Sequence, residues 1–215
     1  MMKHPEIVYL QTTTQCNGHC VYCPFDDIYK NSEIINMDIG QYKVILQWLK
    51  SIDYCGRIGF LLHYEPTLDP RLSKFISIAR NILPGLTLEA ATNGIKKTSA
   101  LSEFDVVDCV LAGSRNIATS RAGNVKACKQ IKYKIQMGSI PCHLPLDTMC
   151  IAANGDVLLC CQDWRHEAVV GTINDLSAAR AKQLSLINSD LELCKDCMMG
   201  KTAEEVGNRL GKRFI

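Results

Sequence analysis

Three cysteines near the N-terminus have a spacing that can hold a metal cluster. They lie in Cys16-Asn-Gly-His-Cys20-Val-Tyr-Cys23, a C-x3-C-x2-C pattern. Three thiolates on one short loop can hold three irons of a [4Fe–4S] cluster, which normally takes four cysteine ligands. Because no fourth cysteine is nearby, we expect one iron to stay open, as catalytic metal sites keep a position for substrate. The alternative is a zinc site with His19 as the fourth ligand, although the adjacent Cys20 strains that chelation.

A second group of cysteines crowds the last third of the chain. Twelve residues lie between Cys142 and Gly155, four lie between Gly155 and Cys160, and Cys194-Lys-Asp-Cys197 follows. Gly155 closes an Asn-Gly dipeptide, a strong signal for a two-residue hairpin, so we expect the strand bearing Cys160 to return beside Cys142. The C-x2-C end would also suit a structural zinc ion.

The elements that must position these cysteines alternate between strands and helices in the first part of the chain. We expect strands over residues 7–13, 57–63, 86–92, 106–112 and 133–137. Helical patterns cover residues 38–52, 69–79, 99–104 and 122–130. This alternation predicts right-handed βαβ units and a parallel sheet. About five parallel strands predict an α/β fold, an open partial (β/α) barrel too short for the eight units of a closed one.

Local signals mark the ends of several elements. Asp38 with Gln41 resembles a capping box, and Asp69–Pro70 predicts a helix start with proline at the first position. In the last third, strands over 148–152 and 157–161 flank the hairpin turn, and a helix follows over 174–187. We place the domain boundary after residue 138, which gives a barrel core over 1–138 and a small Cys-rich hairpin and helix extension over 139–215.

Composition limits the class of protein. The chain has 215 residues, 47% of them apolar, and a net charge of +2, which fits a globular protein and predicts neither nucleic acid nor a membrane surface as partner. No stretch of about 18 apolar residues is present, and we expect no signal peptide, hence a cytoplasmic protein. Twelve cysteines in such a chain indicate metal or redox chemistry rather than disulfides.

The first cysteine loop, placed at the end of the first strand, resembles that of the radical SAM enzymes. The resemblance implies that the open iron binds S-adenosylmethionine, and that one electron from the cluster yields a 5′-deoxyadenosyl radical, which abstracts hydrogen from substrate. His63-Tyr-Glu65-Pro66 resembles the family's Gly-Gly-Glu-Pro motif, and Thr92-Asn93-Gly94 its Thr-Asn-Gly turn. The residues implied to contact S-adenosylmethionine are Tyr22 at adenine, Glu65 at the methionine ammonium, Asn93, and Ser114 at ribose. Two alternatives are an exposed Glu65 near the following helix and a plain tight turn at Asn93.

The second cysteine group resembles the SPASM and twitch extensions of radical SAM proteins. The resemblance implies a second [4Fe–4S] cluster without an open iron, ligated by Cys142, Cys160, Cys194 and Cys197. A fully ligated cluster near the substrate can accept the electron that remains after hydrogen abstraction and deprotonation. A structural zinc site is the alternative.

Four further residues are candidates for contact with the substrate. Arg115 and Arg121 follow the fourth strand, where loops face the active site of parallel α/β folds, and arginine suits a carboxylate or phosphate. Asp163 could accept a proton, and Cys161 could donate a hydrogen atom. The alternatives are solvated arginines, an aspartate that stabilises a turn and a small buried cysteine. Cys150 has no assigned role.

These observations favour an enzyme, a radical SAM oxidoreductase or maturase, that oxidises its substrate by two electrons. Epimerisation and modification of a ribosomal peptide are the alternatives within the family. A non-catalytic iron–sulfur or zinc module is the alternative from another class. We expect a small-molecule or peptide substrate and a one-electron reductant such as flavodoxin or ferredoxin.

Overall fold

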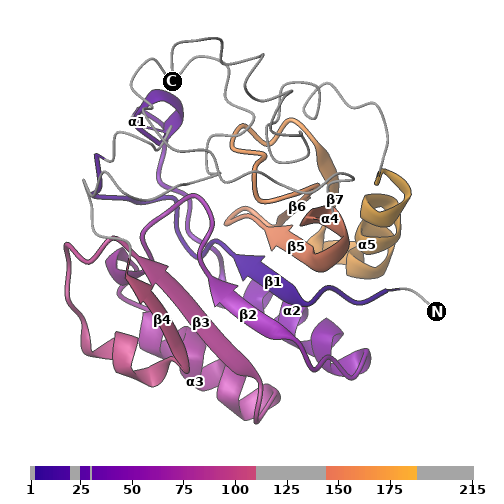
Figure 1. Cartoon of the computed structure of the whole chain (residues 1–215), viewed down its shortest axis with the longest axis horizontal. Helices are drawn as coiled ribbons and strands as arrows, with labels where there is room; N and C mark the ends of the chain where they lie inside the picture. The colour runs from indigo at the N-terminus through magenta and orange to yellow at the C-terminus, as the bar shows by residue number, and fades with distance from the viewer. Residues whose placement is uncertain (1–2, 20–24, 30, 110–143, 188–215) are drawn as a thin grey trace, which may run out of the picture.

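The computed structural model describes residues 3–19, 25–29, 31–109 and 144–187. Within these ranges, seven strands form one sheet in the order β4-β3-β2-β1-β5-β6-β7 (Figure 1). The strands are β1 (Ile7–Leu10), β2 (Arg57–Phe60), β3 (Thr87–Thr92), β4 (Val106–Cys109), β5 (Thr148–Ile151), β6 (Asp156–Leu158) and β7 (Val169–Thr172). Strands β1 to β5 are parallel, and β6 and β7 are antiparallel to their neighbours. The predicted open, mostly parallel sheet is therefore confirmed.

The helices have the following bounds. The α-helices are α1 (Phe25–Tyr29), α2 (Ile39–Ser51), α3 (Leu72–Ile82), α4 (Leu144–Asp147) and α5 (Leu176–Ser185). Short 3-10 helices are η1 (Pro66–Leu68), η2 (Ser99–Glu103) and η3 (Ile173–Asp175). No helix in the described residues has the length and apolar character needed to cross a membrane.

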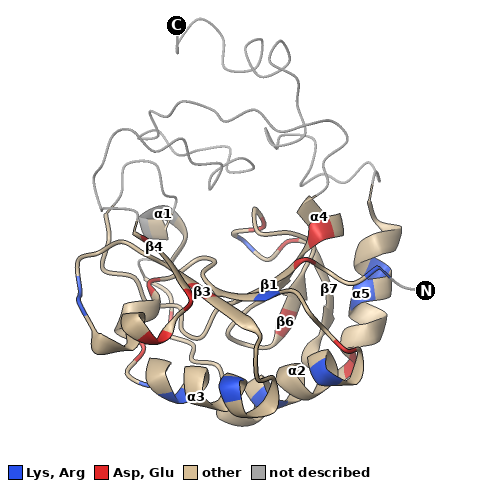
Figure 2. Ribbon diagram, turned by 60° about the horizontal axis from the view of Figure 1, so that its bottom comes forward, with Lys and Arg blue, Asp and Glu red and all other residues tan. Residues whose placement is uncertain are grey.

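The hydrophobic core lies between one face of the sheet and helices α2 and α3, which run side by side in Figure 2. Alternate strand residues face this core, so Val8 and Leu10 of β1 are fully buried. Tyr42 of α2 and Phe75 of α3 pack edge to face with ring centroids 4.8 Å apart, and Phe60 of β2 lies against both. Such aromatic pairs stabilise a core beyond the area that they bury.

The capping box predicted for α2 is confirmed, whereas the predicted start of α3 is wrong. The Asp38 side chain accepts a hydrogen bond from the N3 backbone, and the Gln41 side chain accepts one from Asp38 N (3.0 Å). Helix α3 begins at Leu72 rather than at Asp69–Pro70. Asp69 ends η1 instead, and its carboxylate accepts hydrogen bonds from the Arg71 backbone and guanidinium (2.8–2.9 Å). Arg71 also donates to the carbonyl oxygens of Thr12 and Met37. A contact between distant parts of the chain therefore determines where α3 starts.

The predicted hairpin is confirmed, and it extends the core sheet. Strands β5 and β6 pair antiparallel around Gly155, whose φ of +90° suits glycine. Strand β5 also pairs in parallel with β1, so Cys150 lies opposite Tyr9. Strand β7 was not expected from the sequence. The strand predicted over 133–137, the helix over 122–130 and the boundary after residue 138 lie outside the described residues.

Candidate active site

The carboxylate of Glu65 lies at the carboxyl ends of β2 and β3, surrounded by hydrogen-bond donors. Its Oε1 accepts from Thr67 N (3.1 Å), Thr67 Oγ1 (2.7 Å) and Thr92 Oγ1 (2.7 Å). Its Oε2 accepts from Asn93 N (2.6 Å). Glu65 is only 2% exposed, so the alternative of an exposed carboxylate is wrong, although the side chain does cap η1. The Glu65 backbone N–H donates to Gln15 O (2.9 Å), which connects this motif to the first cysteine loop.

Asn93 brings the third strand to the same cysteine loop. Its Nδ2 donates to Asn17 Oδ1 (2.9 Å) and lies 3.9 Å from Cys16 Sγ. Its Oδ1 accepts from Ile95 N (3.0 Å), so Asn93 also stabilises the tight turn at Gly94, where φ is +70°. The predicted residues Cys16, Glu65 and Asn93, which come from three separate segments, thus lie together at one edge of the sheet.

The two predicted thiolate sets each have one described member. Cys16 follows β1, and Cys160, which is 8% exposed, follows β6. Thiolates are the ligands that iron–sulfur clusters take, so the donor chemistry fits. Within the described ranges no three His, Cys, Asp or Glu side chains are grouped to hold a metal ion. The other predicted site residues lie outside those ranges: Cys20, Tyr22, Cys23, Ser114, Arg115, Arg121, Cys142, Cys194 and Cys197.

Asp163 has a structural role in the turn after β6. It is fully buried, and its Oδ1 and Oδ2 accept hydrogen bonds from Glu167 N and Ala168 N, both at 2.9 Å. These bonds support the structural alternative, in which the aspartate stabilises a turn. Its role as a proton acceptor stays a prediction.

Cys150 and Cys161, two of the cysteines outside the predicted ligand sets, are neighbours. Cys150 is fully buried on β5, whereas Cys161 is partly exposed. Burial raises the pKa of the Cys150 thiol well above its usual range, and the nearby Cys161 raises it further. Cys150 therefore stays protonated and behaves as a small apolar side chain.

A junction that sequence reasoning missed fixes the segment after Cys160 against the Glu65 motif. The His63 ring stacks on Trp164 with centroids 4.0 Å apart, and its Nε2 lies 2.9 Å from Cys161 O. Tyr29, on the helix that follows the first cysteine loop, donates to Trp164 O. His63 stood out only as part of the strand-end motif, and Trp164 carried no signal. The two cysteine-bearing regions therefore share one packing contact.

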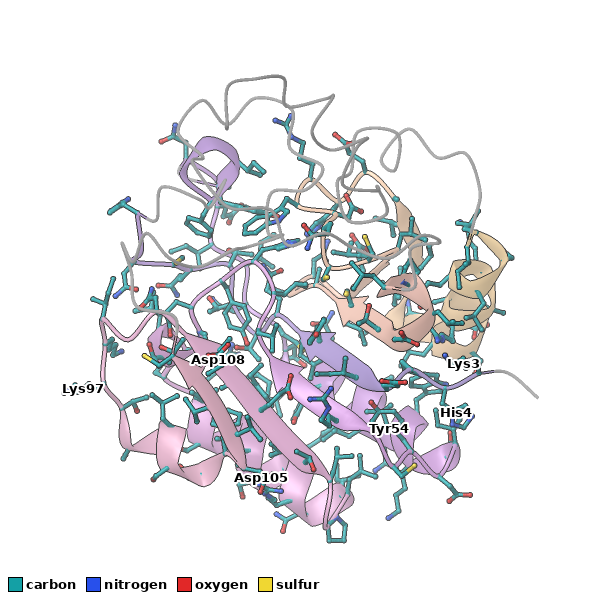
Figure 3. The ribbon with its side chains drawn as sticks, in the orientation of Figure 1. Lys3, His4, Tyr54, Lys97, Asp105 and Asp108 are labelled. Atoms are coloured by element: carbon teal, nitrogen blue, oxygen red, sulfur yellow. The ribbon has the colours of Figure 1, made fainter. Side chains whose placement is uncertain are left out.

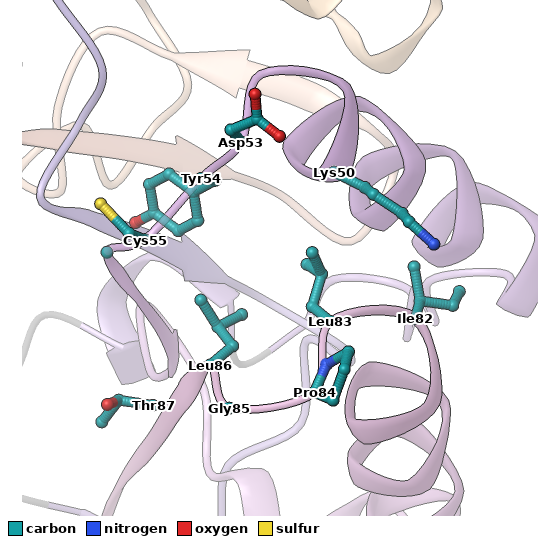
Figure 4. A pocket seen from close by; sticks show the side chains of 11 residues that line it. Lys50, Asp53, Tyr54, Cys55, Ile82, Leu83, Pro84, Gly85, Leu86 and Thr87 are labelled. Atoms are coloured by element: carbon teal, nitrogen blue, oxygen red, sulfur yellow. The ribbon is translucent and has the colours of Figure 1, made fainter.

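A pocket of about 430 Å³ lies at the opposite end of β2 and β3, away from this site (Figure 4). Its lining comes from the ends of α2 and α3 and the turns that lead into β2 and β3: Lys50, Asp53, Tyr54, Cys55, Gly56, Ile82, Leu83, Pro84, Gly85, Leu86 and Thr87. None of the predicted site residues lines it.

Comparisons with known proteins agree with this fold. A family model described as a SPASM iron–sulfur cluster-binding domain matches residues 142–198. A relative from Niallia circulans, the S-adenosyl-L-methionine-dependent 2-deoxy-scyllo-inosamine dehydrogenase, is 25% identical, with 81% of each chain covered. The crystal structure of BtrN in an open conformation has a TM-score of 0.70 at 24% identity, covering 92% of this chain and 94% of that one. BtrN in complex with AdoMet and 2-DOIA has a TM-score of 0.62 at 21% identity, covering 93% and 89%.

The chain is similar to radical SAM enzymes with a SPASM-type extension. The predicted resemblance and fold class are thereby confirmed. The matched region begins at Cys142 and includes Cys160, Cys194 and Cys197, the whole set predicted for the auxiliary cluster. Its description as an iron–sulfur domain favours a cluster over the zinc alternative.

Proposed function

We propose that the chain is a radical SAM dehydrogenase that oxidises a small polyhydroxylated or amino-substituted molecule by two electrons. The hydrogen-bonded carboxylate of Glu65 carries this proposal, because it is buried at the carboxyl ends of β2 and β3 and is linked through Gln15 and Asn93 to the loop that holds Cys16. The dehydrogenase activity of the Niallia circulans relative supports the reaction type.

Each residue of the candidate site then has a defined task. The Glu65 carboxylate accepts hydrogen bonds from the methionine ammonium of S-adenosylmethionine, and its four hydrogen bonds within the protein fix its orientation. Tyr22 and Ser114 contact adenine and ribose. Cys16, Cys20 and Cys23 hold the first [4Fe–4S] cluster, and Cys142, Cys160, Cys194 and Cys197 hold the second. When bound, S-adenosylmethionine and the first cluster supply a 5′-deoxyadenosyl radical that removes one hydrogen atom from substrate.

After the hydrogen atom is removed, loss of a proton and an electron completes the two-electron oxidation of the substrate. Arg115 and Arg121 bind and orient the substrate, and Asp163 is the candidate that takes the proton. The auxiliary cluster, which Cys142, Cys160, Cys194 and Cys197 would hold, would supply an acceptor for the electron. A flavodoxin or ferredoxin in the cytoplasm would supply the electron that reduces the first cluster.

The sheet face opposite the helices suits a substrate with hydroxyl or amino groups. Tyr9 lies over Gly59 on this face, since a Cβ on Gly59 would lie 2.9 Å from the Tyr9 ring. Arg57 Nη1 donates to Glu89 Oε2 (2.9 Å) on the neighbouring strand, and Asp108 follows on β4 (Figure 3). Burial raises the pKa of Glu89, an effect that Arg57 partly offsets. This face is therefore polar, as a substrate with hydroxyl or amino groups requires, and its Arg57–Glu89 pair begins at the amino end of β2, away from Glu65.

The test is anaerobic reconstitution followed by turnover in heavy water. About eight iron atoms per chain would support two clusters. With S-adenosylmethionine, a reductant and 2-deoxy-scyllo-inosamine, we expect one 5′-deoxyadenosine per product molecule, and a product that has lost two hydrogens and carries no solvent deuterium at the reacting carbon. A product with the substrate's composition except for one solvent deuterium, whose formation is abolished in Cys161→Ala, would show an epimerase instead. Bound zinc without 5′-deoxyadenosine would show a non-catalytic module.

A further inference from the structure

Arg180 of α5 is a fully buried cation that binds backbone carbonyls. Its guanidinium donates to the carbonyl oxygens of Lys3 (3.1 Å), Pro145 (2.7 Å), Leu146 (2.6 Å) and Thr148 (3.3 Å). Three of these carbonyls belong to the segment over α4 and the start of β5, which follows Cys142 after one intervening residue. Figure 1 shows α4 and α5 next to each other, and Figure 3 labels Lys3 close to them. Arg180 therefore fixes residues 145–148, a segment that lies shortly after Cys142 in the sequence.

Gln183, one turn later on α5, extends this contact to the segment after β6 that contains Cys160. Its Oε1 accepts from Arg180 Nη1 (2.5 Å), while its Nε2 donates to Thr148 O (3.0 Å) and Leu159 O (2.7 Å). Leu159 directly precedes Cys160. The two side chains thus form one hydrogen-bonded unit that joins the residues after Cys142 to the residue before Cys160.

Among the described residues, the carboxylate that acts most strongly on Arg180 is that of Asp147, which forms its own ion pair with Lys3. None of the ion pairs within the described ranges includes it, and its acceptors are carbonyl and amide oxygens. Burial lowers the pKa of Arg180 to about 10, an effect that Asp147 offsets only in part, so a further negative group nearby would stabilise the cation. A four-thiolate cluster is negatively charged, and net charge is one determinant of its reduction potential.

We infer that Arg180 and Gln183 are positioning residues of the auxiliary cluster, and that the Arg180 charge raises the reduction potential of that cluster. The pair fixes the segments of Cys142 and Cys160 relative to each other. The cation favours the reduced cluster, which carries one more negative charge than the oxidised one. This inference rests on the proposed auxiliary cluster and assigns it a structural and an electrostatic support.

The experiment uses the full chain with Cys16, Cys20 and Cys23 replaced by Ala, so that iron binds only at the auxiliary site. Into this parent we introduce Arg180→Met, Arg180→Lys and Gln183→Leu. Lys182→Met is the matched control, because it removes a charge from the exposed side of the same helix. The readouts are the rate of iron loss to a chelator and the midpoint potential from an EPR-monitored redox titration.

We expect Arg180→Met and Gln183→Leu to lose iron about ten times faster than the parent, since the ligand-bearing segments are no longer tied. At the parent's midpoint, the ratio of reduced to oxidised cluster should fall about tenfold in Arg180→Met, a shift of about 59 mV for one electron. Arg180→Lys should keep the parent's potential because it keeps the charge, and the control should match the parent in both readouts.

Parent-like iron loss and potential in Arg180→Met would overturn the inference. If that variant does not fold, parent-like iron loss in both Gln183→Leu and Arg180→Lys would overturn it. A parent that binds no iron would contradict the proposed auxiliary cluster, and the inference would fall with it. The two failures are distinguishable, because only the first occurs in a parent that holds about four irons.

Discussion

The Glu65 carboxylate accepts four hydrogen bonds, and the residue is only 2% exposed to solvent. We expect Glu65→Gln to weaken binding of S-adenosylmethionine by roughly 10- to 150-fold, because a hydrogen bond to a charged group contributes about 1.5–3 kcal/mol. The amide NH2 would also face hydrogen-bond donors, either those of Thr67 and Thr92 or that of Asn93. Anaerobic isothermal titration of the reconstituted chain measures the Kd.

Glu103→Gln is the control for this substitution. Glu103 is exposed and accepts a hydrogen bond only from Ser73 among the side chains described near it, so its loss should leave the Kd unchanged. A parent-like Kd in Glu65→Gln, with full iron content, would remove Glu65 from the binding site.

His166 makes stability depend on pH. Burial lowers its pKa from the usual 6.5, although Asp163 and Asp156 partly oppose this shift. As the pH falls below about 6.5, the unfolded chain takes up the proton before the folded chain does, so the free energy of unfolding decreases. We expect His166→Asn to flatten this decrease between roughly pH 7 and pH 5. Asn is chosen because His166 has a φ of +55°, which Asn tolerates.

Urea unfolding at several pH values measures the effect, with the exposed His4→Asn as the comparison. An identical pH dependence in wild type and His166→Asn would show that another group causes the acid sensitivity.

Among the elements, the β5–β6 hairpin depends on Gly155. Its φ of +90° disfavours any other residue, and a Cβ there would lie 3.1 Å from Gln41 Nε2. We expect Gly155→Ala to lower the free energy of unfolding by about 1–2 kcal/mol from the backbone alone, and by more with the contact. Gly85 has a similar φ of +87° but open space around it, so Gly85→Ala isolates the backbone part. Chemical denaturation measures both, and a smaller loss at Gly155 than at Gly85 would contradict the steric argument.

The elements that sequence reasoning identified are those with local signals. The α2 capping box lies within four residues, and the hairpin turn within two, so the sequence alone specifies them. The start of α3 was wrong because Arg71 binds Asp69 and distant carbonyls, contacts that no local pattern encodes. The same holds for the active site. The motifs gave Glu65 and Asn93, whereas the stack of His63 on Trp164 joins residues 101 positions apart and carried no signal.

At the scale of the whole molecule, the predicted core and extension share one hydrophobic core. Met149, Ile151, Val157 and Leu159 belong to the same buried cluster as Val8 and Leu10. We expect residues 1–138 alone to lack a cooperative unfolding transition, because β1 would lose β5, one of the two strands with which it pairs. Circular dichroism with urea titration measures this, and co-expression with residues 139–215 should restore folding. A cooperative transition in the isolated fragment would support independent domains.

The pairing of β1 with β5 also bears on how such an enzyme could arise or be rebuilt. The register places Leu10 opposite Ile151, so a slip of one residue would turn every side chain of β5 to the wrong face. An extension of this kind can fold on another barrel only if the first strand of that barrel can pair with β5 in the same register. Grafting designs should therefore exchange β1 together with β5 to β7, and gene fusions that join only the cysteine-bearing tail to a foreign core should give misfolded chimaeras.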